Sequence, residues 1–387
     1  MPNSSVLVID LAEEDESLLV EQVARACSTA GFFQVLNHGI PDELVNEFRH
    51  QCRRYFTELP QSIKDTHRRT ATNSRGYFDD ELTKQRLDWK QALDVGVPGS
   101  RDWSLPDNDP KNSCLDGFNR LPSEEELSGY RDIIVNYFQA CETLSDKITK
   151  LMAAAIDRKI AEEAVQDLKE NHTSYLRMNY YPVYDPEVGE ETSTEEKSPT
   201  SEPPALGISP HRDAGYLTVL LQDDDCHSLQ VWLDNEWQTV VPVKGSFTIN
   251  TGDMAQIWSN GRYKAPLHRV LTNKVKARFS APFFYNPGYK SYMKPVVDAS
   301  PKYHPCLWGY FRAVRFAGDF TNLGVEIQIE DYEINTKKVN NEGEEDAEPV
   351  SDDHPRSHPN IRRQEIFAEK ACMEEPFDVD GFRDLLI

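Results

Sequence analysis

Apolar and polar residues alternate in short runs from about residue 174 to residue 285. Turn residues such as Asn-Gly, Asp-Asn and Gly separate eight of these runs, and we predict that each run forms a strand. In chain order the runs are "SYLRMNYY", "YLTVLLQ", "SLQVWL", "WQTVVPV", "SFTIN", "MAQIWS", "HRVLT" and "RFSAPFFY". Strands this short and evenly spaced are typical of a jelly roll or a barrel. The sequence has no GxGxxG or GxxxxGK[ST] motif, which argues against a nucleotide-binding loop.

The sequence before this block is mainly helical in its periodicity. "VLVIDL" (residues 6–11) and "FFQVL" (residues 32–36) predict two more strands, and an apolar stripe with helical spacing follows each of them. Ser123 and Glu126 form a capping-box pattern ahead of the longest stripe, which runs over residues 130–151. We therefore predict a mixed α and β fold, in which a jelly-roll core has flanking helices and one long helix packs along the barrel.

Composition bounds the class of protein. The chain has 387 residues, 39% of them apolar, which is enough for a large core, and no uncharged apolar run of about 18 residues predicts a membrane span. The N-terminus has no basic region followed by an apolar segment, so we expect no secretory signal. The seven cysteines are scattered without a CxxC pair. A reduced, cytoplasmic protein is the natural interpretation.

The net charge of −23 is unevenly distributed. Residues 185–202 hold seven acids and one lysine, and residues 342–353 hold seven acids and no base. These two segments are poor in apolar residues, and we expect them to be mobile surface loops. The acidity therefore says little about the substrate, but it argues against nucleic acid as a partner because phosphate backbones need a basic face.

One short motif suggests a metal site. Residues two apart on a strand share a face, so His211 and Asp213 of "SPHRDAGYLTVLLQ" would point the same way. His268 begins a later strand of the same block and could supply a second imidazole. Two imidazoles and one carboxylate on one face of a metal are typical of a mononuclear non-haem iron site. Taken alone, the His-x-Asp triplet is weak evidence for a metal, and an ordinary ion pair or a turn-capping pair is the preferred interpretation; with His268 as a third ligand, the two interpretations are about equally favoured.

A second pair of residues favours the metal. Arg278 and Ser280 of "ARFSAPFFY" are also two apart on one strand, ten and twelve residues beyond His268. A guanidinium beside a hydroxyl is a receptor for a carboxylate. The flanking aromatic residues make a solvent-facing arginine less expected. The pattern fits a keto acid that chelates the metal at one end and is held by Arg278 at the other.

The ordered set of motifs resembles the iron(II)- and 2-oxoglutarate-dependent oxygenases, in their isopenicillin N synthase-like branch. The resemblance covers about residues 6–332 and rests on "VLVIDL", "GFFQVLNHGIP", "FTELP", "SRGY", "DWKQALDVG", "NRLP", "RMNYYP", "HRD", "HRV" and "RFS" in this order. It implies an N-terminal helix and strand region over residues 1–120, and a long helix plus a double-stranded β-helix catalytic core over residues 121–335. From its composition, we expect an acidic segment and tail over residues 336–387.

The resemblance also implies roles for individual residues. Iron ligands are expected at His211, Asp213 and His268, and 2-oxoglutarate contacts at Arg278, Ser280, Asn179 and Tyr181. Five further residues lie in segments that the resemblance places near the mouth of the cavity: Arg75, Tyr77, Lys90, Phe284 and Tyr285. For the two cations of this group, a position on the surface fits the sequence equally well.

The implied reaction uses 2-oxoglutarate and O2, releases succinate and CO2, and oxidises a small molecule by hydroxylation, desaturation or oxidative cyclisation. The substrate would be a secondary metabolite or amino-acid-like compound, ascorbate could be needed to keep the iron reduced, and no obligate protein partner is evident. Two alternatives stay open. One is an iron oxidase of the same fold that does not consume 2-oxoglutarate, and the other is a non-catalytic binding protein.

Two features depart from the family's pattern. Arg212, the middle residue of the triplet, is usually small or polar. Strand alternation directs it away from the metal, so a structural ion pair is the preferred interpretation, and contact with an acidic substrate is the alternative. The acidic insertion over residues 184–206 is longer than the family's usual loop. A surface insertion is expected there, and a lid over the site is the alternative.

Overall fold

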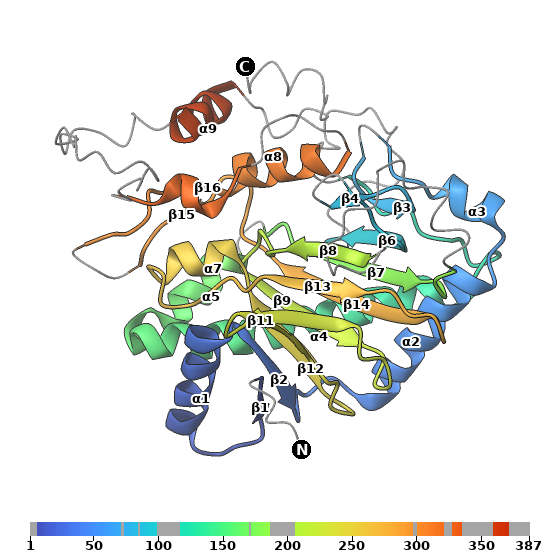
Figure 1. The fold of residues 1–387 in the computed structure, drawn as a ribbon, viewed down its shortest axis with the longest axis horizontal. Coiled ribbons are helices and arrows are strands. Elements are labelled where there is room, and N and C mark those ends of the chain that lie inside the picture. The colour runs from blue at the N-terminus through green and yellow to red at the C-terminus, as the bar shows by residue number, and fades with distance from the viewer. Residues whose placement is uncertain are drawn as a thin grey trace.

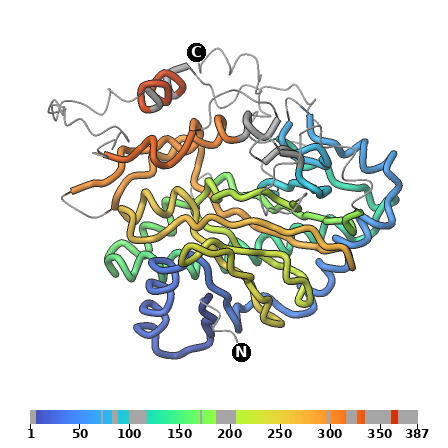
Figure 2. The backbone as a smooth tube through the Cα atoms, viewed as in Figure 1, coloured from blue at the N-terminus to red at the C-terminus, as the bar shows by residue number. Residues whose placement is uncertain are grey.

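The computed structural model describes residues 6–70, 73–83, 86–98, 117–169, 172–185, 206–296, 300–320, 327–334 and 359–370 (Figure 2). Nearly all of the acidic insertion, and most of the acidic segment and tail beyond residue 335, lie outside this part of the chain. The predicted mobility of these segments therefore stays a prediction. Within the described residues, no helix is long and apolar enough to cross a membrane.

The largest element is a mixed sheet of eight strands (Figure 1). Its spatial order is β1-β2-β12-β9-β14-β7-β6-β3, which interleaves strands from the N-terminal region with strands from the predicted block. The strand bounds are β1 Leu7–Asp10, β2 Phe32–Leu36, β3 Gly76–Phe78, β6 Gln91–Gly96, β7 Tyr175–Tyr181, β9 Leu217–Gln222, β12 Phe247–Thr251 and β14 Arg278–Tyr285. The pairing of β7 with both β14 and β6 is antiparallel and regular, so side chains alternate strictly between the two faces of the sheet.

A second sheet of four strands has the order β11-β10-β13-β8. Its strands are β8 Leu206–His211, β10 Leu229–Leu233, β11 Glu236–Thr239 and β13 His268–Leu271. Nine buried residues contributed by both sheets form a small apolar cluster between them: Val6, Ala30, Phe32, Tyr181, Leu220, Leu229, Val231, Val240 and Val270. The two packed sheets form the double-stranded β-helix that the sequence predicts. Two short hairpins complete the strands: β4 Leu82–Thr83 with β5 Arg86–Leu87, and β15 Tyr292–Met293 with β16 Cys306–Leu307.

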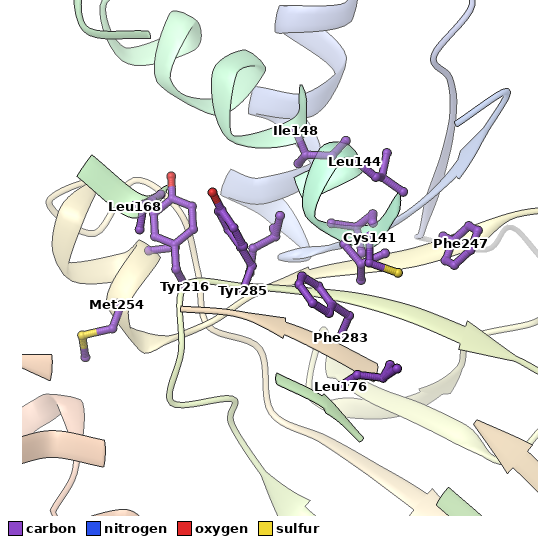
Figure 3. Close-up of a cluster of buried hydrophobic side chains, with 14 of the residues drawn as sticks. Cys141, Leu144, Ile148, Leu168, Leu176, Tyr216, Phe247, Met254, Phe283 and Tyr285 are labelled. Carbon is purple, nitrogen blue, oxygen red and sulfur yellow. The ribbon is translucent and has the colours of Figure 1, made fainter. Parts of the chain in front are cut away.

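Helices cover the other face of the large sheet, and the main core lies between them. Phe283 of β14 packs edge-on against Phe138 of α4, with ring centroids 4.9 Å apart, and Figure 3 shows Phe283 and Tyr285 directed toward that helix. The helix bounds are α1 Glu16–Thr29, α2 Asp42–Thr57, α3 Gln61–Thr66, α4 Tyr130–Ile156, α5 Ala161–Lys169, α7 Asp253–Trp258, α8 Trp308–Phe320 and α9 Pro359–Lys370, with short 3-10 turns at Arg158–Ile160 and Ile329–Tyr332. The long helix packed along the barrel is α4. In Figure 1, α8 and α9 lie at the end of the molecule opposite α1.

One of the eight predicted strands is wrong, and the predicted capping box does not itself begin the long helix. The run "MAQIWS" forms helix α7 and not a strand, because Gln256 and Ser259 make backbone hydrogen bonds to the carbonyls four residues earlier. Short apolar runs fit both periods, and this one packs as a helix against the main core. The capping box of Ser123 and Glu126 is formed, but it closes a turn, and the long helix begins only at Tyr130, after Gly129.

Candidate metal centre and co-substrate site

Three candidate metal ligands meet at one end of the smaller sheet. β8 ends at His211 and β13 begins at His268, and the antiparallel register places these two residues opposite each other. Asp213 follows β8 two residues later. One donor atom from each of the three side chains lies within 4.8 Å of the other two. Asp213 Oδ1 is 3.7 Å from Nε2 of His211 and 3.6 Å from Nε2 of His268, so the three predicted ligands come together.

Hydrogen bonds to the backbone determine which nitrogen of each imidazole faces the centre. Nδ1 of His211 lies 2.8 Å from the carbonyl oxygen of Ser209, and Nδ1 of His268 lies 3.1 Å from that of Pro266. A carbonyl oxygen only accepts, so each Nδ1 must carry the proton. Each Nε2 then has a lone pair directed toward Asp213, which is the state in which an imidazole binds a metal.

The carboxylate of Asp213 is oriented in the same way. Its Oδ2 accepts hydrogen bonds from Thr218 Oγ1 at 2.6 Å and from Asn250 Nδ2 at 2.8 Å. Oδ1 is left to face the two imidazoles. Both donors come from the large sheet, whereas the histidines belong to the small one. The ligand set N, N, O with oriented donors fits a divalent iron ion.

The protonation states of the ligands also fit a metal. Burial lowers the pKa of His211 to about 3, and His268 acts in the same direction, so the imidazole is neutral at pH 7. Burial by itself would raise the pKa of Asp213. The positive charge that either histidine carries when protonated, together with the hydrogen bonds from Asn250 and Thr218, outweighs burial and lowers this pKa below its ordinary value. The carboxylate is therefore ionised and ready to act as a ligand.

The predicted 2-oxoglutarate contacts lie together on the inner face of the large sheet, the face turned toward the small sheet. Ser280 pairs with Asn179, and Arg278 pairs with Tyr181. The Cζ atom of Arg278 lies 4.9 Å from the centroid of the Tyr181 ring, and Asn179 Nδ2 donates to Ser280 Oγ at 3.5 Å. Arg278 is only 1% exposed. Its Nε and Nη1 groups have no hydrogen-bond partner among the described residues, so a buried cation with two free donors faces the interior.

Lys90 lies beside this set, inside the protein and not on its surface. It forms ion pairs with Glu81 and with Asp88, and all three side chains are buried. Glu81 also pairs with Arg177, whose guanidinium makes a bidentate contact with Asp94 at 2.8 Å on both arms. Burial opposes the ionised form of Glu81, but the surrounding cations lower its pKa. This network of buried ion pairs therefore stays charged at neutral pH.

The other predicted substrate contacts divide between the two faces of the sheet. Phe284 lies on the inner face and stacks on Tyr175, with ring centroids 4.6 Å apart. Arg75 is also buried there, and its Cζ is 5.2 Å from the Tyr175 ring centroid, so the surface position considered for it is wrong. Tyr285 instead donates to Asp146 on α4. It is turned away from the interior, which does not fit a substrate contact.

Tyr77 lies on the wrong face for the same reason. Its hydroxyl lies 3.1 Å from Asp79 and 3.4 Å from Gln61 of α3. Arg212 makes a structural contact of another kind than the ion pair that the sequence suggests: its Nη1 donates to the backbone carbonyl of Ala265, and the side chain is exposed.

Sequence reasoning missed several inner-face residues that surround the site. They are Phe78, Tyr175, Arg177, Thr218, Gln222 and Asn250. Strand alternation counted from Asn179 could have identified Tyr175 and Arg177 on β7, but the residues on β3, β9 and β12 require knowledge of the pairing register.

Comparisons with known proteins agree with this geometry. A model described as "non-haem dioxygenase in morphine synthesis N-terminal" matches residues 6–124, and the 2OG-Fe(II) oxygenase superfamily model matches residues 172–287. Jasmonate-induced oxygenase 2 of Arabidopsis thaliana is 32% identical over 320 residues, which are 79% of this chain and 76% of that protein. The chain belongs to the 2OG-Fe(II) oxygenase superfamily. Gibberellin 20 oxidase 2 of Arabidopsis thaliana is another relative of this oxygenase, 29% identical over 80% of this chain and 77% of that protein.

Solved structures show the same fold. A crystal structure of JOX2 in complex with 2OG, Fe and JA has a TM-score of 0.65 and 31% identity, and covers 79% of this oxygenase and 83% of that chain. The 2-oxoglutarate complex of dioxygenase for auxin oxidation 1 from Arabidopsis thaliana has a TM-score of 0.59 at 24% identity, covering 76% and 99%, which shows the fold alone. The predicted family, double-stranded β-helix fold and enzyme class are confirmed. The protein is an Fe(II)/2-oxoglutarate-dependent dioxygenase, with Fe(II) and 2-oxoglutarate as its cofactor and co-substrate.

Proposed function

We propose that His211, Asp213 and His268 hold the Fe(II), and that Arg278 receives the far carboxylate of 2-oxoglutarate. One observation carries this assignment. Arg278 is buried between the two sheets, where the three oriented ligand atoms also lie, and its Nε and Nη1 groups have no hydrogen-bond partner among the described residues. A dicarboxylate with a keto group can chelate a metal at one end and present a carboxylate at the other. Ser280 adds a hydroxyl donor beside the guanidinium.

Bound iron and 2-oxoglutarate supply the oxidising chemistry: 2-oxoglutarate and O2 give succinate and CO2, one oxygen atom enters succinate, and the other oxidises a C–H bond of the substrate. The protein's own residues bind and orient. Asp213 and the two imidazoles supply three ligand atoms, which leaves the other coordination positions for 2-oxoglutarate and O2. The apolar cluster between the sheets, which includes Phe32 and Leu220, excludes water from this interior. No side chain has to act as a general acid or base.

We propose further that the substrate is a small molecule with an acidic group, either a secondary metabolite or an amino-acid-like compound. Three guanidinium groups approach the ring of Tyr175 on the inner face. The Cζ atoms of Arg75, Arg177 and Arg312 lie 5.2, 5.9 and 5.3 Å from its centroid. Arg177 is already paired with Asp94 and Glu81. The ring of Tyr175, flanked also by Arg75 and Arg312, favours a planar or apolar body joined to a carboxylate.

Helix α8 connects this group of arginines to the metal ligands. Arg315, one turn beyond Arg312, pairs with Asp253 at 3.2 Å, and the Asp253 N–H donates to the carbonyl of Asp213 at 2.8 Å. The names of some relatives also support the acidic class. JOX2, 31% identical, was solved with JA, and homoarginine-6-hydroxylases of soybean and Arabidopsis thaliana are 30 to 31% identical.

The test is succinate formation with Fe(II), 2-oxoglutarate and ascorbate, measured for carboxylic acids and for their methyl esters. We expect acids to stimulate succinate release and the esters not to do so. Arg312→Gln should raise KM for the acid at least tenfold, because it removes one charged donor, while the exposed Arg25→Gln should change nothing. Equal turnover of acids and esters would contradict the acidic class. Oxygen uptake without succinate formation would instead indicate the oxidase that does not consume 2-oxoglutarate. His268→Ala, which removes a proposed metal ligand, should abolish turnover.

A further inference from the structure

The guanidinium of Arg278 has a single polar contact among the described side chains. Its Nη2 donates to Oε1 of Gln222 at 3.3 Å. No carboxylate within the described ranges lies within ion-pairing distance of it, although the arginine is 1% exposed. A buried guanidinium is normally paired with an acid, since an isolated buried charge is strongly destabilising. Its partner here is a neutral amide.

This amide has a hydrogen-bond partner at both of its ends. Gln222 is 6% exposed on the inner face of β9, where it pairs with Ser280. Its Nε2 donates to Thr248 Oγ1 of β12 at 3.2 Å. A reversed amide would place its NH2 donors against the donors of Arg278, so the guanidinium keeps the amide oxygen toward itself, and the Thr248 hydroxyl, which can accept, takes the NH2 group at the other end. The backbone carbonyl of Gln222 also accepts from Arg49 of α2 at 2.9 Å, which holds the end of the strand.

The same sheet face contains the contrasting arrangement. Arg177 lies on β7, two strands away from Gln222 on β9. Its Nε and Nη2 groups both donate to the carboxylate of Asp94, each at 2.8 Å. With Glu81 on Nη1, every nitrogen of the Arg177 guanidinium has a carboxylate partner, and its charge is neutralised. Gln222 instead takes one N–H of Arg278 and leaves Nε and Nη1 without a partner. The two arginines differ in whether a ligand can still bind to them.

We infer that Gln222 is a positioning residue for 2-oxoglutarate, and this inference rests on the co-substrate site proposed above. The amide holds the guanidinium of Arg278 in place without neutralising it. Two buried donors and a full positive charge then remain for the distal carboxylate of the co-substrate. A glutamate of nearly the same shape at this position would compete with that carboxylate for Arg278.

The test compares 2-oxoglutarate binding to the full chain carrying Gln222→Glu with binding to the wild type. Both are loaded with Mn(II) without oxygen, and the Kd is measured by titration calorimetry. We expect Gln222→Glu to weaken 2-oxoglutarate binding at least thirtyfold, with the Kd for Mn(II) unchanged. Binding of 2-oxobutanoate, which lacks the distal carboxylate, should be the same in both proteins. Gln230→Glu is the matched control, because Gln230 also accepts from an arginine, Arg269, at 2.9 Å but belongs to the small sheet.

Thermal unfolding without ligand separates positioning from a structural role. In Gln222→Glu, the new carboxylate pairs with the buried charge of Arg278. We therefore expect its unfolding midpoint to equal or exceed that of the wild type, although it binds 2-oxoglutarate more weakly. A structural role predicts that both quantities fall together. Gln222→Met stays neutral and should weaken binding three- to tenfold, which provides the test if the glutamate variant does not fold.

A Kd for Gln222→Glu within threefold of the wild type would overturn the inference. Wild-type protein that binds Mn(II) but no 2-oxoglutarate would overturn both this inference and the proposed co-substrate site. Wild-type protein that binds 2-oxoglutarate without ever forming succinate would overturn only the proposed reaction.

Discussion

Replacing Thr218 with valine tests how the metal ligands are oriented. The change keeps the β-branched shape and removes one hydroxyl, which donates to Asp213 Oδ2 at 2.6 Å. Both residues are buried, so water cannot replace the lost donor without a rearrangement. Asn250 still donates to the same oxygen at 2.8 Å and holds part of the geometry. The carboxylate then becomes freer to rotate away from the position in which Oδ1 faces the imidazoles.

The size of the effect follows from that one bond. A hydrogen bond to a charged group contributes roughly 1.5–3 kcal/mol, and each 1.4 kcal/mol is about a tenfold change in Kd. The metal-free protein loses the bond as well, and Asn250 remains, so we expect the lower end of this range. Thr218→Val should weaken binding of Mn(II) or Fe(II) about tenfold, and the double variant with Asn250→Leu about a hundredfold. Removal of partners that orient a metal ligand typically costs about 10–100-fold in affinity.

The assay is competition for metal against a chromophoric chelator, without oxygen, at pH 7. Thr218→Ser keeps the hydroxyl and should bind metal within threefold of the wild type. Urea unfolding of the metal-free proteins checks that the valine variant is folded. A valine variant with the wild-type Kd would refute the reasoning, because Oδ2 would then not need its hydroxyl donor.

Two further predictions concern stability. Asp94→Asn should lower the free energy of unfolding, measured with urea, by about 3–5 kcal/mol, since Arg177 loses a buried bidentate partner. Asp79→Asn changes a more exposed ion pair, with Arg68, and should lower it by about 1 kcal/mol or less. Equal losses in the two variants would contradict the role of burial. Burial raises the pKa of Asp253 to about 6 from 3.8, although Arg315 opposes this shift. The folded protein therefore binds this proton more tightly than the unfolded chain does. We compare the free energy of unfolding of the metal-free wild type with that of Asp253→Asn, which has no proton to lose at this position. The difference in favour of the wild type should be highest below pH 4 and should fall by about 3 kcal/mol as the pH rises through 6. A difference that stays flat from pH 4 to 7 would contradict this.

Strand alternation made part of the site predictable from the sequence. Arg278 and Ser280 are two apart on a regular strand, and the structure places both on the inner face. The same rule, counted seven residues from Arg278, sends Tyr285 to the helix-covered face, so the sequence already contained the signal against it as a substrate contact. Phe284, six residues from Arg278, is correctly on the interior. Where the position on a strand was known, side-chain direction could be predicted.

Features that depend on distant parts of the chain could not be predicted. His211 and His268 face each other only because β8 and β13 pair in a particular register, and 56 residues separate them in the chain. Lys90 looks like a surface lysine until Glu81 and Asp88 are seen to be buried beside it. Local pattern gives the face of a strand, but burial of a charge depends on partners that only the folded chain brings together.

The site divides its two binding tasks between the two sheets. Both imidazoles belong to β8 and β13 of the small sheet, whereas Arg278 and Ser280 belong to the large one. Among the three metal ligands, Asp213 connects the two sheets, because it follows β8 yet accepts its hydrogen bonds from Thr218 and Asn250 of the large sheet. A chelating dicarboxylate held at both ends would therefore bridge the sheets across the small apolar cluster between them. Because that cluster is small, ligand binding should contribute a substantial share of the free energy that holds the sheets together.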